Sequence, residues 1–161
     1  MQKLSPSTLD NISQCPCFEY RPYTPDSGGA ADEGIMLHEA LLTGDDDALN
    51  EEQIRTLEIT RDFCKAQLTA YLNWTDTPVA QRIELHEQKL VGSLGLRGLM
   101  DKCYVSLTSR KALVADFKSD RLGMIAEAKD SLQGACYVDM VFHRYPGLID
   151  SVTFALISPR T

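Results

Sequence analysis

The sequence predicts an α/β protein in which α-helices flank a central β-sheet. Its 161 residues fit one domain, residues 1–161, because domains usually contain about 100–200 residues. Hydrophobic residues recur at helical spacing before Pro78, and short segments of alternating polarity dominate after it. The predicted order is helix, helix, helix, strand, strand, strand, helix, strand, and that order is typical of a sheet covered by helices.

The first half of the chain predicts helices separated by turn-forming residues. Ser5 followed by Pro6 is typical of a helix start, since serine caps helices and proline is tolerated in the first turn. Prolines and paired glycines over residues 19–30 predict a loop, a kind of segment that can clamp a substrate. The predicted helices cover residues 5–14, 31–42 and 50–73.

The second half predicts strands and one long helix. Ile83, Leu85 and Glu87 follow a strand-like alternation, and glycines at 92 and 95 separate this segment from the next. A turn at residues 109–111 precedes a short apolar strand. The predicted strands cover residues 79–91, 96–107, 113–117 and 149–157, and the helix covers residues 124–144.

Composition predicts a cytoplasmic protein with free thiols. No apolar run approaches the roughly 20 residues that a membrane span needs, and residues 1–9 show no secretory signal, so no membrane partner is expected. The cysteine count is odd and lacks framework spacing, which favours reduced thiols over disulfides. No second pair at ligand spacing follows Cys15 and Cys17, so a zinc site is not expected. The cysteines are Cys15, Cys17, Cys64, Cys103 and Cys136.

Net charge argues against binding nucleic acid through bulk electrostatics. The formal charge is −7, the opposite sign to that of proteins that grip phosphates with their whole surface. Part of the negative charge is local, in the acidic segment 45–52. A site that collects carboxylates for a divalent metal also adds negative charge, and the bound cation reverses the sign there.

A possible catalytic centre is predicted at Asp101, Asp116 and Lys118. Alternation places Asp116 and Lys118 on one face of a strand, and a hairpin closed through residues 108–111 would bring Asp101 within reach. Carboxylates suit a hard divalent cation, and an ammonium can position a water or stabilise phosphate charge. The alternative is a solvated strand end, but two aspartates held together without a cation would repel.

Four short motifs resemble those of a known nuclease superfamily. Residues 98–101 (GLMD) and 116–118 (DFK) resemble the G-x-x-D and D/E-x-K signature of PD-(D/E)XK nucleases. Residues 34–39 (GIMLHE) resemble the G-x-x-x-H-E helix of the RecB-like branch, and residues 133–137 (QGACY) resemble its Q-x-x-x-Y motif. The opening residues 5–9 (SPSTL) and 15–16 (CP) also resemble the usual start of that branch, so the matches follow the family's order over residues 5–137. The resemblance implies a restriction-endonuclease-like core, with a central mixed β-sheet flanked by α-helices.

The resemblance also implies a metal centre that uses Mg²⁺ or Mn²⁺. Its ligands would be His38, Asp101 and Asp116, joined by the Phe117 carbonyl. Taken alone, His38 is more often a hydrogen-bonded histidine than a ligand. Relatives with an iron–sulfur cluster carry three cysteines after the Q-x-x-x-Y helix, and no cysteine follows Cys136, so no cluster is expected.

Further roles follow from the same resemblance. Lys118 would be the catalytic lysine. Glu87 matches a carboxylate position often present on the strand before Asp101, and Glu84 is the competing choice. Gln133 and Tyr137 lie one helical turn apart and would orient the lysine or contact the DNA backbone.

The implied activity is a Mg²⁺- or Mn²⁺-dependent deoxyribonuclease. The resemblance to small viral exonucleases favours an exonuclease of phage recombination and repair, which leaves an endonuclease open. DNA would be the substrate, and a homo-oligomer or a single-strand annealing or recombination protein could be a partner. A phage-encoded enzyme would work in the host cytoplasm.

Two other functions remain open at this point. The same fold could serve as a non-catalytic module that binds nucleic acid or protein, or as a metal-dependent hydrolase of another substrate. A basic groove beside the site would favour DNA. The cations that could form it are Arg21, Lys89, Lys102, Lys111, Arg121 and Lys129.

Overall fold

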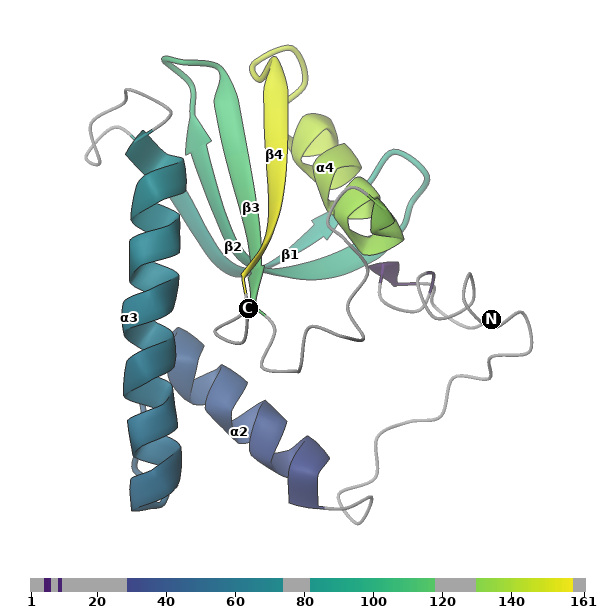
Figure 1. Ribbon diagram of the computed structural model, residues 1–161. Coiled ribbons are helices and arrows are strands. Elements are labelled where there is room, and N and C mark those ends of the chain that lie inside the picture. The colour runs from purple at the N-terminus through teal and green to yellow at the C-terminus, as the bar shows by residue number, and fades with distance from the viewer. Residues whose placement is uncertain (1–4, 7–8, 10–28, 74–81, 118–129, 158–161) are drawn as a thin grey trace.

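A mixed β-sheet packed between helices forms the protein (Figure 1). The computed structural model describes residues 5–6, 9, 29–73, 82–117 and 130–157. Within them the sheet has four strands in the order β1-β2-β3-β4. The first three strands are antiparallel neighbours, and β4 is parallel to β3. The predicted α/β class, with helices flanking a sheet, is confirmed.

Most predicted elements are present, with shifts at their ends. The helices are α2 (Gly29–Thr43), α3 (Glu51–Asn73) and α4 (Leu132–Arg144), and the strands are β1 (Ile83–Val91), β2 (Arg97–Ser106), β3 (Lys111–Phe117) and β4 (Ser151–Ile157). Gly29 and Ala30 are helical, so the loop prediction was wrong there. The rest of that predicted loop lies outside the described residues. Of the predicted first helix, the structure describes Ser5, Pro6 and Leu9, and the Leu9 N–H donates to the Ser5 carbonyl at 3.1 Å.

The start of α4 differs from the prediction. A helix was predicted from residue 124, but α4 begins at Leu132, and residues 124–129 lie outside the described part of the chain. Ser131 has extended backbone angles, and its side chain accepts a hydrogen bond from the Gly134 N–H at 3.0 Å. Serine favours this capping geometry over a position inside a helix, which explains the later start.

The two faces of the sheet are covered by different helices. Helix α4 packs on one face through Tyr137, Met140 and Val141, and α2 and α3 cover the other. Each face is apolar because residues of β2 and β3 alternate between the two sides. The sheet residues below α4 include Cys103, Val105, Ala112 and Val114, and those facing α2 and α3 include Tyr104, Leu113, Ala115 and Phe117.

The described cysteines are free, as predicted for them. Cys64 and Cys103 are buried and Cys136 is partly buried, and none forms a disulfide. Burial raises the pKa of the Cys64 thiol to about 11 and that of the Cys103 thiol to about 12. Both thiols are therefore protonated near neutral pH and contribute to the core as small apolar side chains.

Gly134 marks a close approach of α4 to the sheet, where a methyl group has no room. A Cβ built at Gly134 would collide with the ring of Phe154 on β4. We expect Gly134→Ala to lower the free energy of unfolding by about 1–3 kcal/mol through overpacking, although alanine is favoured over glycine inside a helix by about 1 kcal/mol. Urea unfolding followed by circular dichroism measures this loss.

Two further variants serve as controls for this packing. Phe154→Leu in the same chain should recover part of the loss, since a double-mutant cycle between touching residues shows coupling. Ala135→Gly, at the exposed neighbouring position, should cost only the helix propensity of about 1 kcal/mol. A Gly134→Ala protein as stable as the wild type would contradict the close approach.

Candidate active site

Asp116 is a buried carboxylate at the end of β3, beneath the first turn of α4. It is 3% exposed, and its Oδ1 accepts a hydrogen bond from Gln133 Nε2 at 3.3 Å. Gln133 Nε2 also donates to the Tyr137 hydroxyl at 3.0 Å, and that hydroxyl donates to the Leu99 carbonyl at 2.8 Å. This chain of hydrogen bonds joins β3, α4 and β2, and it brings the predicted Gln133–Tyr137 pair to Asp116.

Tyr137 is placed to position its neighbours. Its side chain is 4% exposed, and burial raises the pKa of the phenol, with the charges of Asp116 and Asp101 adding to the rise against the Gln133 hydrogen bond. The phenol therefore stays protonated near neutral pH and acts as a donor to the Leu99 carbonyl. Its hydrogen bonds hold the Gln133 amide and the Leu99 carbonyl in place.

Asp101 lies near the end of β3, because the Phe117 N–H donates to its carboxylate at 2.8 Å. The last pair of the β2–β3 ladder is Lys102 with Ala115, and Asp101 and Asp116 are the next residues along the two strands. The predicted antiparallel hairpin is confirmed, with residues 107–110 connecting the two strands. The charges of both aspartates raise the pKa of Tyr137, which places them in one electrostatic environment.

The sheet is distorted at Asp101. Met100 and Cys103 both pack into the core beneath α4, so the regular alternation of β2 shifts between them. On the neighbouring strand Glu87 has a φ of +43°, a left-handed conformation that non-glycine residues rarely adopt. The pairs on either side of Glu87 set it opposite Asp101. Both strands therefore deform at the same point, as sheets commonly do beside functional sites.

Helix α2 places His38 beside Asp101. His38 Nε2 lies 3.2 Å from Asp101 Oδ2, and the same oxygen accepts the Phe117 N–H at 2.8 Å. The His38 side chain is 33% exposed and that of Asp101 is 13% exposed, so the contact lies at the edge of solvent. The histidine of the predicted G-x-x-x-H-E helix thus meets the aspartate of the predicted G-x-x-D strand.

The pairing of β1 sets Glu87, and not Glu84, opposite Asp101. Glu84 pairs with Tyr104, and its charge adds to the burial that raises the Tyr104 pKa to about 12, which places Glu84 near the face covered by α2 and α3. Glu84 also lies 3.4 Å from His86 Nε2. Glu87 is the one that stands opposite Asp101.

The described donors offer part of a metal-binding set. Adjacent ligands on an ion with bonds of about 2.1 Å lie about 3.0 Å apart, close to the 3.2 Å between His38 and Asp101. Nitrogen and carboxylate donors suit Mn²⁺, and carboxylates suit Mg²⁺. Among the residues that the structure describes, however, no group of three or more His, Cys, Asp or Glu side chains is close enough to hold a metal ion.

The remaining predicted residues are placed as follows. Phe117 contacts Asp101 through its backbone N–H, and Lys118 lies outside the described residues. Lys102 places its ammonium 5.8 Å from the centroid of the Phe117 ring. Sequence reasoning missed the Leu99 carbonyl and the Phe117 N–H, because backbone groups leave no signal in residue identity. It also missed the left-handed Glu87, since glutamate gives no hint of that conformation.

Comparison with known proteins adds no relative. No protein-family model matches the chain, and no curated protein matches it. No helix in the described part of the chain is long and apolar enough to cross a membrane. The functional argument therefore rests on the residues themselves.

The left-handed conformation of Glu87 predicts that two similar glycine substitutions on β1 change stability differently. Glu87→Gly should leave stability unchanged or raise it, because glycine adopts a positive φ at no steric cost, whereas other residues pay about 1–2 kcal/mol. Glu84→Gly, in a regular stretch of the same strand, should cost about 0.5–1 kcal/mol. Thermal unfolding of both variants measures the difference. Equal losses in the two proteins would remove the argument that the backbone at Glu87 is strained.

Proposed function

We propose that the protein is a metal-dependent deoxyribonuclease with a PD-(D/E)XK-type site on a restriction-endonuclease-like core. Its activity is that of an exonuclease of phage recombination and repair. The observation that supports this best is convergence: His38 contacts Asp101, Asp101 accepts the N–H of Phe117, and Asp116, the residue before Phe117, accepts a hydrogen bond from Gln133. These residues come from separate motifs and separate elements, and a solvated strand end would not gather them.

The chain's own residues would hold and orient the carboxylates. His38, Asp101 and Asp116 would bind Mg²⁺ or Mn²⁺, together with the Phe117 carbonyl. When bound, the ion would lower the pKa of a water and neutralise charge on the phosphate. The Phe117 N–H fixes one oxygen of Asp101, and Gln133 fixes one oxygen of Asp116. A carboxylate buried as deeply as Asp116 needs polar or charged partners, and a cation would be one of a suitable kind.

Lys118 completes the proposal. It follows Phe117 directly, and strand alternation from Asp116 would direct its side chain to the same face. There an ammonium would orient the attacking water and stabilise charge on the phosphate. The alternative function, a binding module without catalysis, is favoured by the net charge of −7 and by the absence of a three-residue metal group among the described residues.

A cleavage assay separates these functions. End-labelled linear and closed circular double-stranded DNA are incubated with the protein in Mg²⁺, Mn²⁺ or EDTA. We expect metal-dependent loss of the linear DNA only. Because electrostatic stabilisation by a site of this kind contributes several kcal/mol, Lys118→Ala and Asp116→Asn should slow cleavage by about 100-fold or more.

The control variant is Asp62→Asn, an identical change at an exposed position of α3, which should leave the rate unchanged. Cleavage of circles as well as linear DNA would make the enzyme an endonuclease. No cleavage by the wild-type protein with either metal would replace the proposal with the binding module.

A further inference from the structure

Strands β1 and β2 continue beyond β3 as a two-stranded ribbon. Strand β2 pairs with β3 only over residues 102–106, whereas its pairing with β1 continues to residue 97. We call this extension, residues 88–91 and 97–100, the distal ribbon. Figure 1 shows it passing beside α4 and away from β3 and β4. Its two faces therefore have different surroundings from those of the four-stranded part of the sheet.

Helix α4 covers one face of the distal ribbon. Leu90 and Met100 are buried there, in the core cluster that α4 shares with the sheet. At the turn between the strands, Asp139 of α4 accepts hydrogen bonds from the Ser93 N–H at 2.8 Å and from the Ser93 hydroxyl at 2.7 Å. A two-stranded hairpin alone is only marginally stable. These contacts therefore hold the distal ribbon in a fixed position.

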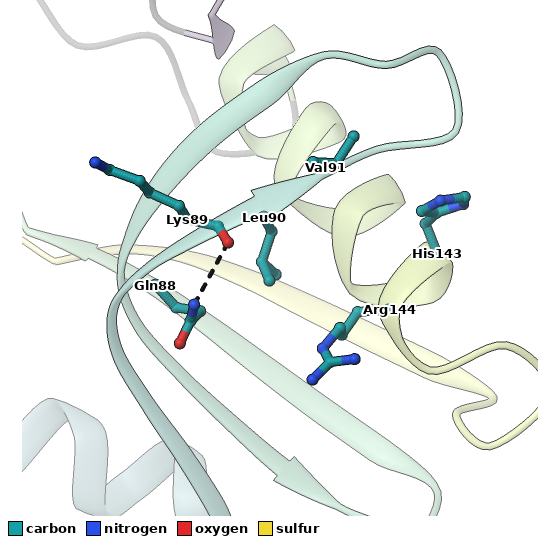
Figure 2. A pocket seen from close by; sticks show the side chains of 6 residues that line it. All are labelled: Gln88, Lys89, Leu90, Val91, His143 and Arg144. Atoms are coloured by element: carbon teal, nitrogen blue, oxygen red, sulfur yellow. Dashed lines mark hydrogen bonds between the residues drawn. The ribbon is translucent and has the colours of Figure 1, made fainter.

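The opposite face of the distal ribbon is exposed. Residues of a cross-strand pair share a face, and the faces alternate along each strand, so the pairs Lys89–Leu99 and Val91–Arg97 point away from α4. Figure 2 shows the Lys89 side chain extending from β1 to the side away from α4. Val91 is 45% exposed and Leu99 is 44% exposed, and both cations are exposed. We call these four side chains the open face.

The cations of the open face are available to an anion. Among the described residues, no ion pair involves Lys89 or Arg97. Charged side chains on exposed strands discourage pairing with other chains, which is one reason for their presence. That reason does not apply to Val91 and Leu99, because exposed apolar side chains promote association. A surface that combines both kinds of side chain is suited to a partner with negative and apolar groups.

The open face leads to the candidate active site. Asp101 follows Leu99 by two positions and contacts His38 of α2, a helix that packs on the sheet face opposite α4. Asp101 and the open face therefore lie on the same side of the sheet. At about 3.4 Å per residue, Leu99 and Arg97 are about 7 and 14 Å from Asp101 along β2. One strand of B-form DNA advances about 3.4 Å per nucleotide, so these distances correspond to about two and four nucleotides.

We propose that the open face holds the DNA backbone beside the bond that is cut. Lys89 and Arg97 contact phosphates, and Val91 and Leu99 pack against the deoxyribose rings between them. This inference rests on the proposed nuclease function. It supplies a local positive contact for DNA on a protein whose net charge is −7. A protein partner on the same face would leave DNA binding independent of these four residues.

The first arm of the test removes charge. Lys89→Gln with Arg97→Gln alters the open face, and Arg55→Gln with Lys65→Gln removes equal charge from exposed positions of α3. Binding of a fluorescently labelled DNA duplex is measured by anisotropy in EDTA over a series of salt concentrations. The open-face variant should bind about tenfold more weakly or worse, with a salt dependence lower by about two phosphate contacts. The α3 variant should match the wild type.

The second arm removes apolar surface and leaves the charge unchanged. Val91→Thr with Leu99→Thr should weaken binding by about fivefold, with an unchanged salt dependence. Threonine is favoured in strands and both positions are half exposed, so the urea midpoint should stay close to that of the wild type. The matched control is Ile59→Thr, at an apolar position of α3 that is 62% exposed, which should bind DNA like the wild type.

The outcomes separate this surface from the nuclease activity. Wild-type affinity in both open-face variants would overturn the DNA surface, whether or not DNA is cut, and a wild-type salt dependence of the charge variant would overturn the phosphate contacts. Binding that depends on the open face, without cleavage by the wild type in Mg²⁺ or Mn²⁺, would retain the surface and overturn the nuclease. A wild-type protein that neither binds nor cuts DNA would overturn both.

Discussion

The structure depends on how one buried carboxylate is held. Asp116 lies beneath α4 at 3% exposure, where an uncompensated charge would cost several kcal/mol. The hydrogen bonds from Gln133 to Asp116 and to Tyr137, and from Tyr137 to the Leu99 carbonyl, connect this carboxylate to α4 and β2. The same bonds fix α4 on the sheet, and Gly134 allows the close contact that places Gln133 there. The packing of α4 on the sheet and the position of Gln133 beside Asp116 therefore depend on the same contacts.

The distortion of β1 and β2 at Asp101 brings the Asp101 carboxylate within reach of helix α2. Because β1 and β2 deform together at Glu87 and Asp101, the Asp101 carboxylate reaches both the Phe117 N–H and His38. A regular sheet would direct it to one face only. The left-handed backbone at Glu87 lowers the stability of the fold beside Asp101. Strained backbone of this kind is commonly found at functional sites.

Sequence predicted the class of fold and the partners within the site better than it predicted details of the backbone. Alternation and helical spacing located α2, α3 and the strands, and the family resemblance grouped His38 with Asp101 and Gln133 with Tyr137. The start of α4 was missed because a local hydrogen bond at Ser131 overrides helix propensity. The strand register, which residue identity does not encode, is what sets Glu87 rather than Glu84 opposite Asp101.

The central proposal is that a divalent cation would bring His38, Asp101 and Asp116 into one site, since in the described part of the structure these three side chains are not yet close enough together to hold a metal ion. Binding of Mn²⁺ to the purified protein, measured by electron paramagnetic resonance and by isothermal titration calorimetry, tests it most directly. The account predicts saturable binding that Asp101→Asn and His38→Gln each weaken by about tenfold or more, a loss typical of removing a ligand or its support, while Asp62→Asn leaves it unchanged. Saturable binding with equal affinity in all four proteins, or no binding by the wild type, would contradict it.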